Sequence, residues 1–396
     1  MSVITANSNA KAPPPPTKRA TSSPASDWRP HPLMALYRDN QVLVPAVILS
    51  LACLSALLSP TLPALLPLAH LVMPYRHATS PSASGLYAKG PADLAFILGG
   101  VLFWTLARAL TIDYLLKPLG KRLGCRRSLI DRFGEQGWLV IYYSLSFSIG
   151  LSFARAAPYW RNTMHFWTNY PHAHLAGDFK VYYLAQLAFW IQQLLVIHIE
   201  KPRKDYVQML VHHIVTCALI VGSYVSNFTR MGTAVLVTMD VGDIFLSSAK
   251  CFNYVNWRTI CDATFVVFVG VWLYSRHYIY YFLIRSVYVE APKYLEWRWA
   301  PSEGRFVSDA MWYFFLALLG VLQVLLIIWL YMILRVIAKV VKGSSAEDTR
   351  SDDEDEVDVD EDDQQQQQQQ EDDGPKKVSG VHKSSPKSGP ARKRRA

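Results

Sequence analysis

The sequence predicts an all-α polytopic membrane protein of about eight transmembrane helices, with a polar tail at each end. Composition is the first observation: 51% of the 396 residues are hydrophobic and only 18% are charged. The second is that the hydrophobic residues gather in windows close to the ~20 residues that a helix needs to cross a bilayer. These windows are residues 41–58, 93–116, 138–153, 181–199, 207–225, 231–248, 261–284 and 310–336.

The first window follows a polar, proline-containing segment, residues 1–40, which we expect to be a disordered cytoplasmic tail. Because the window begins far from the first residue, it does not resemble a cleaved signal peptide, and we expect it to remain as a helix. A helix buried in a soluble core is the alternative, and seven companion windows argue against it. After this window, Pro60, Pro63 and Pro67 interrupt the apolar run and predict a kinked or interfacial segment.

Three further parts follow along the chain. We expect residues 41–130 to form two transmembrane helices and a basic cytoplasmic linker, and residues 131–341 to form a domain of six transmembrane helices. Residues 342–396 combine an acidic run, a glutamine run and a basic end, so they predict a disordered cytoplasmic tail without a core. Several hydroxyl residues of this tail precede an acidic residue by three positions, a pattern that favours acid-directed phosphorylation. They are Ser344, Ser345, Thr349 and Ser351.

Basic residues in short loops predict the orientation, because such loops stay on the cytoplasmic side. Residues 117–132 hold six Lys or Arg and residues 201–204 hold three, which places both segments and both tails in the cytoplasm. Residues 285–305 are an exception, with four basic residues that three glutamates offset in part. The closing residues 393–396 resemble a dibasic retrieval signal, and we therefore expect the endoplasmic reticulum membrane.

Four ionisable residues interrupt two adjacent windows: His212 and His213 in one, Asp240 and Asp243 in the other. A charge at the centre of a membrane helix costs roughly 2.5 to 3.5 kcal/mol on insertion scales, so these groups are expected to face partners or a site. At 1.5 Å per residue from the cytoplasmic ends, all four lie about 10 to 15 Å deep. The two carboxyl groups share one helix face, and the sequence predicts that the four groups meet.

Three kinds of site are compatible with this pattern. Metal binding uses both residue types, but neighbouring histidines chelate poorly, so we expect no metal. Polar residues also join membrane helices, a role that the hydroxyl groups nearby already supply. Acid–base or nucleophilic chemistry, in which a carboxylate orients the imidazole, is the interpretation that we favour.

The motifs around these residues resemble those of the ceramide synthases, which are TLC-domain membrane proteins. They read HHxxT from His212, SYxxNxxRxG from Ser223, DxxD from Asp240 and AKxxNY from Ala249. The resemblance covers about residues 131–341, with KVYYLAQLAFWIQQ at residues 180–193 in agreement. It is of the fungal type, because no homeodomain-like insert separates the second and third windows.

This resemblance implies N-acylation of a sphingoid long-chain base, sphinganine or phytosphingosine, by a fatty acyl-CoA co-substrate, giving ceramide or dihydroceramide and CoA. It implies no cofactor, no nucleic acid, contact with membrane lipids, and a homo- or heterodimer with a small single-span regulatory subunit. His212 would act as nucleophile or general base and His213 would orient it or shuttle the proton. Asp240 and Asp243 would hold the imidazole and bind the ammonium group. The expected substrate-binding or supporting residues are Asp205, Tyr224, Asn227, Arg230, Lys250 and Asn253.

Two other functions were compared with this one. A non-catalytic TLC-type protein that binds lipids or accompanies a translocon would not need a carboxylate pair opposite a histidine pair. A membrane hydroxylase or desaturase would carry several HxxxH or HxxHH clusters, and the sequence has none. The acyl chain length and the preferred base do not follow from the sequence.

Overall fold

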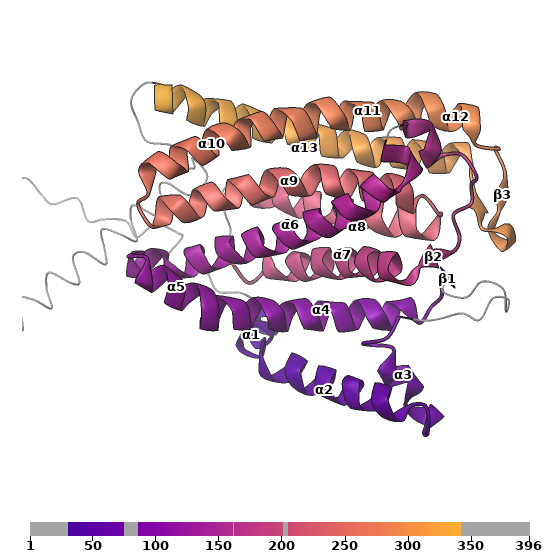
Figure 1. Ribbon diagram of the computed structural model, residues 1–396, viewed down its shortest axis with the longest axis horizontal. Coiled ribbons are helices and arrows are strands. Elements are labelled where there is room, and N and C mark those ends of the chain that lie inside the picture. The colour runs from indigo at the N-terminus through magenta and orange to yellow at the C-terminus, as the bar shows by residue number, and fades with distance from the viewer. Residues whose placement is uncertain (1–30, 75–85, 161, 201–204, 342–396) are drawn as a thin grey trace, which may run out of the picture.

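The long apolar windows become long helices in the computed structural model, which describes residues 31–74, 86–160, 162–200 and 205–341. Figure 1 shows these helices lying roughly parallel, with α2 set to one side against α4. The long helices are α2 (Leu43–Leu58), α4 (Asp93–Leu110), α6 (Ile130–Ala156), α7 (Gly177–Val196), α8 (Tyr206–Val225), α9 (Thr229–Tyr254), α10 (Arg258–Leu273) and α13 (Asp309–Val341). The prediction of a helical, multi-pass membrane protein is therefore confirmed at this level.

Shorter elements join these helices. The short α-helices are α1 (Pro32–Asp39), α3 (Leu66–Ala69), α5 (Lys117–Arg122), α11 (Tyr280–Arg285) and α12 (Ala291–Tyr294). Wider, π-helical turns form η3 (Thr111–Leu116), η7 (Tyr274–Ile279) and η8 (Ser286–Glu290). The 3₁₀ turns are η2 (Pro63–Leu65), η4 (Arg127–Leu129), η5 (Pro158–Trp160), η6 (Thr163–Phe166) and η9 (Pro301–Glu303). The strands are β1 (Leu86–Tyr87), β2 (Leu175–Ala176), β3 (Trp299–Ala300) and β4 (Arg305–Phe306).

Five helical stretches of the described chain are long and apolar enough to cross a membrane. They are Asp93–Arg122, Arg127–Ala156, Tyr206–Val225, Arg258–Tyr294 and Asp309–Ala338. The other three predicted windows also lie on helices, but α2 has only 16 residues, and α7 and α9 fall outside this set. The α7 helix buries three polar side chains inside the protein, those of Lys180, Gln186 and Gln192. Buried polar side chains thus lower the mean hydropathy of the two central helices α7 and α9.

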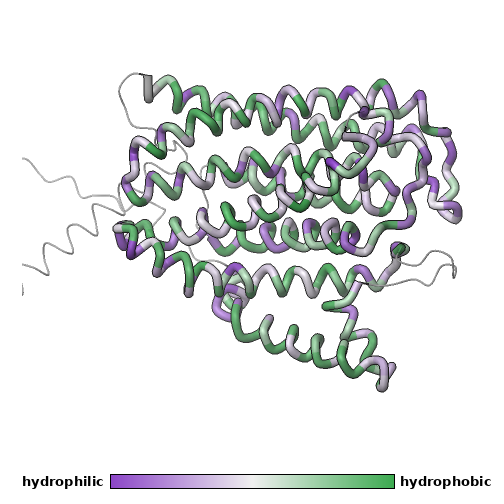
Figure 2. The backbone as a smooth tube through the Cα atoms, viewed as in Figure 1, coloured by the Kyte–Doolittle hydropathy of each residue, from purple (hydrophilic) through white to green (hydrophobic). Residues whose placement is uncertain are grey.

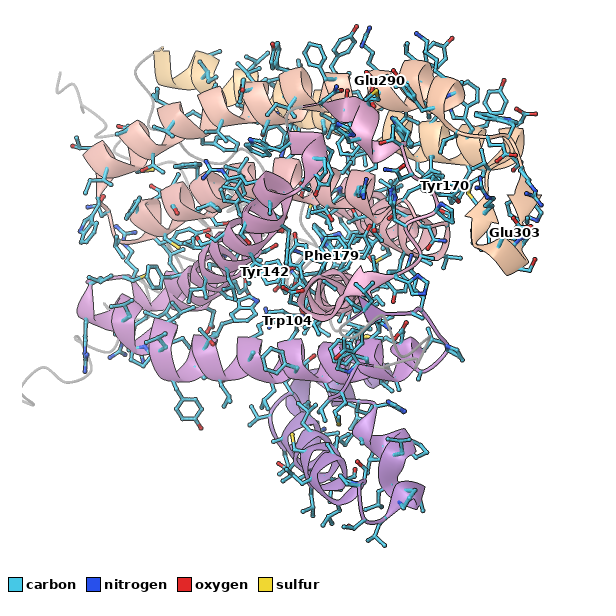
Figure 3. The ribbon with its side chains drawn as sticks, turned by 45° about the vertical axis from the view of Figure 1, so that its right-hand side comes forward. Trp104, Tyr142, Tyr170, Phe179, Glu290 and Glu303 are labelled. Carbon is cyan, nitrogen blue, oxygen red and sulfur yellow. The ribbon has the colours of Figure 1, made fainter. Side chains whose placement is uncertain are left out.

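The bundle is built from neighbouring helix pairs. The α4 helix packs along α7 and α7 along α8, while α6 packs along α9 and α9 along α10; α13 closes the bundle against α8. Aromatic rings fill the space between α4, α6 and α7, where Tyr142 stacks on Phe189 and lies edge-on to Trp104 at 5.2 Å. Figure 3 shows Trp104 and Tyr142 in this interior. Figure 2 shows that apolar residues follow the helix lengths and hydrophilic residues gather toward the loops.

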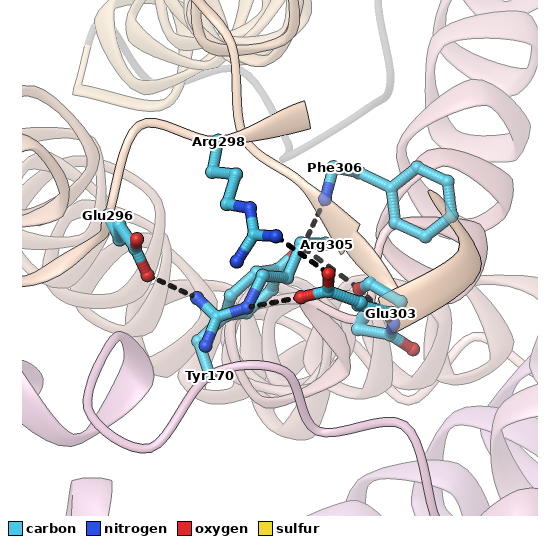
Figure 4. Close-up of polar contacts among 8 residues, drawn as sticks. Tyr170, Glu296, Arg298, Glu303, Arg305 and Phe306 are labelled. Atoms are coloured by element: carbon cyan, nitrogen blue, oxygen red, sulfur yellow. Dashed lines mark hydrogen bonds and ion pairs between the residues drawn. The ribbon is translucent and has the colours of Figure 1, made fainter. Parts of the chain in front are cut away.

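The two ends of the bundle differ. One end carries α5, the turn between α9 and α10, and the end of α13; the other carries both small sheets (Figure 1). There β1 pairs with β2, and β3 pairs with β4 through a turn in which Gly304 has a φ of 71°, a conformation that favours glycine. Figure 4 shows Tyr170 beneath this hairpin: its hydroxyl accepts a hydrogen bond from the Phe306 amide at 2.9 Å and donates to the Ser226 carbonyl at 2.9 Å.

The arginines of residues 285–305, the segment whose basic residues did not fit the predicted orientation, are paired with glutamates. Arg298 lies 2.7 Å from Glu303, and Arg305 lies 3.0 Å from Glu296 (Figure 4). Arg285 also approaches Glu290, at 3.9 Å. These pairs balance the arginine charges locally, but the positive-inside rule counts Lys and Arg alone, so the segment still differs from the predicted orientation.

The predicted tails lie largely outside the described residues, as do residues 201–204 and the proposed phosphorylation positions. The last part of the predicted tail 1–40 differs from the expectation, because residues 32–39 form helix α1. Its Tyr37 hydroxyl lies 2.8 Å from the buried Thr105 hydroxyl of α4, which gives this helix a partner. Beyond α2, the prolines produce the short turns η2 and α3, as the predicted interruption required.

Candidate active site

A largely apolar cavity lies between α8, α9 and α13, with about 930 Å³ of atom-free space when its open part is counted. Its side walls include Leu219 of α8, Met239 of α9 and Leu322 of α13. It extends to the end that carries the β3–β4 hairpin, where Phe306 and Val307 contribute to the lining. A concave, mostly apolar cavity of this kind suits a ligand that has a hydrocarbon chain and a polar group.

His212 lines this cavity, seven residues into α8. Its ring is held between two indoles, Trp190 of α7 and Trp329 of α13, each with a ring-centre distance of 5.3 Å and an interplanar angle of 81°. Its Nδ1 atom is buried and has no hydrogen-bond partner among the residues that the structure describes. Packing against aromatic rings, rather than a carboxylate, therefore orients this imidazole.

His213 is buried and points differently, because adjacent residues of a helix project about 100° apart. Its Nδ1 atom lies 2.5 Å from the backbone carbonyl oxygen of Met209, one turn earlier. A carbonyl oxygen only accepts, so Nδ1 carries the proton and donates it. In the neutral ring, Nε2 then holds the lone pair.

Asp240 is buried at the interface of α9 with α6 and α7. Its Oδ2 atom accepts a short hydrogen bond from the Ser146 hydroxyl, and Gln186 in turn donates to Ser146. The Tyr142 hydroxyl donates to Gln186 Oε1 at 2.7 Å and completes the chain of contacts. Three uncharged side chains from two helices thus fix Asp240, while its Oδ1 atom has no hydrogen-bond partner within the described chain.

Asp243 has a cationic partner. Its Oδ2 atom lies 2.6 Å from a terminal nitrogen of Arg276, which comes from the π-helical segment η7. Arg276 is also close enough to Asp240 and His212 for their charges to interact. Arg276 is therefore a common neighbour of both carboxylates and of the imidazole that lines the cavity.

The structure places His212, Asp240 and Asp243 near the common neighbour Arg276, but with different pairing from the sequence expectation. Neither imidazole hydrogen-bonds to a carboxylate among the described residues. The reason is that each carboxylate has a nearer donor: Ser146 for Asp240 and Arg276 for Asp243. The described residues also contain no group of three or more His, Cys, Asp or Glu side chains arranged to hold a metal ion.

Two predicted supporting residues, Tyr224 and Asn227, lie at the hairpin end in a polar cluster. The Tyr224 hydroxyl donates to Asp93 Oδ2 at 2.8 Å, and Asp93 pairs with the fully buried Lys180 at 2.7 Å. Lys89 donates to Asn227 Oδ1 and to the Tyr224 carbonyl, each at 2.5 Å. This cluster ties the α8–α9 turn to the start of α4 and to α7, and so has a structural role.

Asn227 also reaches the β3–β4 hairpin, because its Nδ2 atom donates to the Gly304 carbonyl at 2.8 Å. Its amide is therefore buried and fully engaged, although it stands in a glycosylation sequon. Burial, and next the charge of Lys180, lower the pKa of the half-buried Lys89 to about 7, while Asp93 acts in the opposite direction. This is a large shift for a lysine outside the spanning helices.

The other supporting residues are dispersed. Asp205 is buried just before α8, and Arg230 donates to the His165 carbonyl at 2.8 Å near the hairpin end. Lys250 is half-buried on α9, seven residues after Asp243, and Asn253 is exposed near the end of that helix. The residues that line the cavity include none of these four.

Sequence reasoning missed Arg276, Ser146, Gln186, Trp190 and Trp329. Arg276 carried a usable signal, because it is a charged residue within the predicted window 261–284. Gln186 and Trp190 stood inside the quoted segment 180–193. Ser146 and Trp329 had no distinguishing signal, since serine and tryptophan are ordinary residues of membrane helices.

Comparisons with known proteins identify the family of the chain. A family model described as the TLC domain matches residues 132–335, which include every residue around the cavity named above. The chain is 38% identical over 325 residues to sphingosine N-acyltransferase lag1 of Schizosaccharomyces pombe, covering 82% of the chain and 81% of that protein. It is 38% identical over 303 residues to the sphingosine N-acyltransferase-like protein ALT7 of Alternaria alternata, covering 69% and 70%. Ceramide synthase LAG1 of Saccharomyces cerevisiae is 34% identical over 281 residues, covering 68% and 66%.

Proposed function

The chain belongs to the TLC-domain family, among its sphingosine N-acyltransferases, and from this premise we propose how it makes ceramide. The reaction joins the acyl group of a fatty acyl-CoA to the amine of a sphingoid base such as sphinganine or phytosphingosine, and releases CoA. One observation carries the assignment of the site: His212 is an ionisable ring that lines an apolar cavity between three helices. Such a cavity suits the alkyl chain of the acyl group, and the imidazole stands where the thioester would lie.

The chemistry requires a group that reacts with the thioester or removes a proton from the amine. In one route, an imidazole nitrogen of His212 attacks the thioester carbonyl carbon, the carbon–sulfur bond breaks and CoA leaves as the thiolate. The amine then attacks the acyl-imidazole, the amide bond forms and the imidazole leaves. In the other route, the amine attacks the thioester carbonyl directly while His212 accepts one of its protons, and the carbon–sulfur bond breaks to release the CoA thiolate. In both, the neutral amine loses one proton, which ends on the CoA thiolate, and the additional proton of an incoming ammonium ion passes to solvent.

A dry cavity favours this transfer over hydrolysis. The walls around His212 are apolar, with Leu219, Met239 and Leu322 among them, so water has few partners there. The two indoles keep the ring in place without occupying the cavity. We therefore assign the first role in acyl transfer to His212, and assign His213 to orientation or proton shuttling.

The carboxylates meet the charged end of the base in this proposal. The incoming amine arrives as an ammonium ion, and a buried carboxylate stabilises it until its proton is removed. Asp240 has an oxygen without a hydrogen-bond partner among the described residues, so it is better placed for this than Asp243, which Arg276 neutralises. Non-catalytic lipid binding, the alternative, does not account for this arrangement of charges.

The setting of the enzyme follows from the same premise. We propose eight transmembrane helices, the last six forming the TLC domain, in the endoplasmic reticulum membrane with both tails cytoplasmic. Basic residues at the α5 end, such as Lys121 and Arg122, suit the phosphates of CoA. A dimer and a small single-span regulatory subunit remain part of this proposal, and it includes neither cofactor nor metal.

The test uses the full chain, purified in detergent, with labelled sphinganine and a series of acyl-CoA lengths. Ceramide detected by mass spectrometry, lost in His212→Ala and strongly reduced in Asp240→Asn, is the expected result. Incubation with acyl-CoA alone separates the routes, because only the first adds the mass of an acyl group to the protein. Full activity of both variants would overturn the proposed site, and wild-type protein without any product would overturn the function.

A further inference from the structure

Thr216 is a hydroxyl residue of the cavity wall whose proton the described chain does not use. It lies on α8 one turn after His212, closes the HHxxT motif and lines the same cavity. The residue is 8% exposed, and its Oγ1 atom is buried without a hydrogen-bond partner among the residues that the structure describes. Buried hydroxyl groups are rarely left in this state, because they have lost their contact with water and gained nothing in return. The Thr216 donor is therefore available to a ligand.

A free hydroxyl is unusual for a threonine inside a helix. Such a side chain often donates to the backbone carbonyl four residues earlier. Thr105, Thr233 and Thr238 do so, at 2.7 to 2.9 Å. Thr216 makes no such bond to the His212 carbonyl. The fold thus leaves this donor unused beside the imidazole that the proposed chemistry needs.

Most other polar side chains of the cavity wall are engaged. Ser308 lies at the hairpin end, where the Met311 amide donates to it at 3.3 Å. Trp190 is different, because its Nε1 atom is buried without a partner within the described chain and its ring centre lies 5.3 Å from that of His212. The two free donors therefore flank one imidazole. The lining side chains that are hydrogen-bonded to other protein groups at 2.5 to 2.9 Å are Trp167, Tyr183, Ser223, Trp297 and Trp312.

Donors at this place suit an oxygen that gains charge during acyl transfer. In both proposed routes, the attack on the thioester gives a tetrahedral centre whose oxygen carries a negative charge. Side chains four residues apart on a helix have Cβ atoms about 5 to 6 Å apart, so a carbonyl group at the His212 imidazole comes within reach of Thr216. In a cavity that excludes water, a hydrogen-bond donor stabilises such a charge more than it would in solvent.

We propose that the Thr216 hydroxyl and the Trp190 indole N–H form the oxyanion site of acyl transfer. This inference rests on the proposed function. When the nucleophile attacks the carbonyl carbon, the π electron pair moves to the oxygen, and the two groups donate hydrogen bonds to it while keeping their protons. The pair returns to the carbonyl bond when the carbon–sulfur bond breaks and the CoA thiolate leaves. These hydrogen bonds are strongest in the transition state, so they raise kcat more than the affinity for acyl-CoA.

The experiment compares Thr216→Val, Thr216→Ser and Thr238→Val in the purified full chain. Valine keeps the shape of threonine without its hydroxyl, so kcat of Thr216→Val should fall by about 100-fold while KM for acyl-CoA stays within about twofold. Thr216→Ser restores the hydroxyl and should stay within about tenfold of the wild type. Thr238→Val is the matched control and should match the wild type. Thr238 is also 8% exposed, but it does not line the cavity and its hydroxyl donates to the Ala234 carbonyl.

The second donor is tested at the two indoles that contact His212. Trp190 and Trp329 have the same ring-centre distance from it, 5.3 Å, and the same interplanar angle, 81°, but Trp329 is not among the lining residues. Phenylalanine keeps an aromatic ring and removes the N–H group at either position. Trp190→Phe should therefore lower kcat by about tenfold more than Trp329→Phe does. Equal losses would overturn the assignment of Trp190.

An unreactive substrate analogue separates stabilisation of the transition state from loss of cavity shape. An S-alkyl-CoA thioether has the chain and the CoA group but no carbonyl oxygen, so its inhibition constant should agree within about twofold for the wild type and Thr216→Val. Inhibition that weakens as much as kcat falls would show damage to the cavity, and would overturn the proposal. Active wild type with equally active Thr216→Val would overturn this inference alone, whereas wild-type protein that makes no ceramide would defeat the proposed function.

Discussion

The Nδ1 atom of His213 lies 2.5 Å from the backbone carbonyl oxygen of Met209, so this histidine is tied to its own helix. The adjacent His212 has no such tie at Nδ1 among the described residues and instead lines the cavity between two indoles. Two identical, consecutive side chains thus have different surroundings. The difference supports the roles proposed for them, His212 for chemistry and His213 for orientation.

Replacing each histidine by asparagine tests this division. Asparagine keeps a donor that can reach the Met209 carbonyl, so His213→Asn should retain activity within about tenfold of the wild type. His212→Asn removes the reacting nitrogen and should lower kcat/KM by at least about 100-fold. Initial rates of ceramide formation measure both. Equal losses in the two variants would contradict the division of roles.

The cavity predicts a second result, for which α13 offers a matched pair of adjacent residues. Leu322 lines the cavity and is 2% exposed, whereas the neighbouring Val321 is 42% exposed on the outer surface. Leu322→Trp should fill part of the cavity and lower kcat/KM by about tenfold or more for long acyl-CoA, with a smaller loss for short chains. Val321→Trp should leave the rates nearly unchanged. If both variants have the kcat/KM of the wild type for every acyl-CoA length, the acyl chain does not lie in this cavity.

Much of the fold could be predicted because apolar periodicity and length follow directly from the bilayer. All eight predicted windows lie on helices, and the prolines after α2 mark its end. The limits of the helices were less predictable, because interior packing extends α6 to residues 130–156 and α9 to residues 229–254, past the apolar windows. The helix α1 was missed, since its stability depends on a contact with α4 that no local pattern reports.

The candidate site was predictable as a set of residues, but not as a network. The cost of charges in a membrane indicated His212 and Asp240, and the same rule applied to the window 261–284 would have indicated Arg276. Which donor meets which carboxylate depends on tertiary packing. Ser146 is an example, because it lies on α6 outside every quoted motif, and its role comes from the contact of α6 with Asp240 on α9.

The contact of Ser146 with Asp240 leads to a third prediction, on stability. Ser146→Ala removes a donor from a buried carboxylate oxygen, so the free energy of unfolding should fall by about 1–3 kcal/mol. Ser148→Ala is the control, because Ser148 is exposed on the same helix and its hydroxyl donates to the Ser144 backbone carbonyl one turn earlier. Denaturant unfolding in detergent compares them. An unchanged stability in Ser146→Ala would show that Asp240 finds another donor, and would weaken the role given to the Ser146 contact.

Lys89 gives the last prediction, which concerns pH. Burial lowers the pKa of Lys89 to about 7 in the folded protein from its usual value near 10.5, so between these values the unfolded chain binds more protons. Stability from this group therefore rises with pH between about 7 and 10, by at most about 1.4 kcal/mol per pH unit, and is flat below 7.

Lys89→Met should remove that rise, and it also removes the hydrogen bonds to Asn227 and to the Tyr224 carbonyl. The measurement is the unfolding midpoint between pH 6.5 and 9.5, with Lys121→Met, at an exposed position of α5, as the control for loss of one lysine. Parallel pH curves for Lys89→Met and the wild type would mean that Lys89 keeps its proton in the folded cluster.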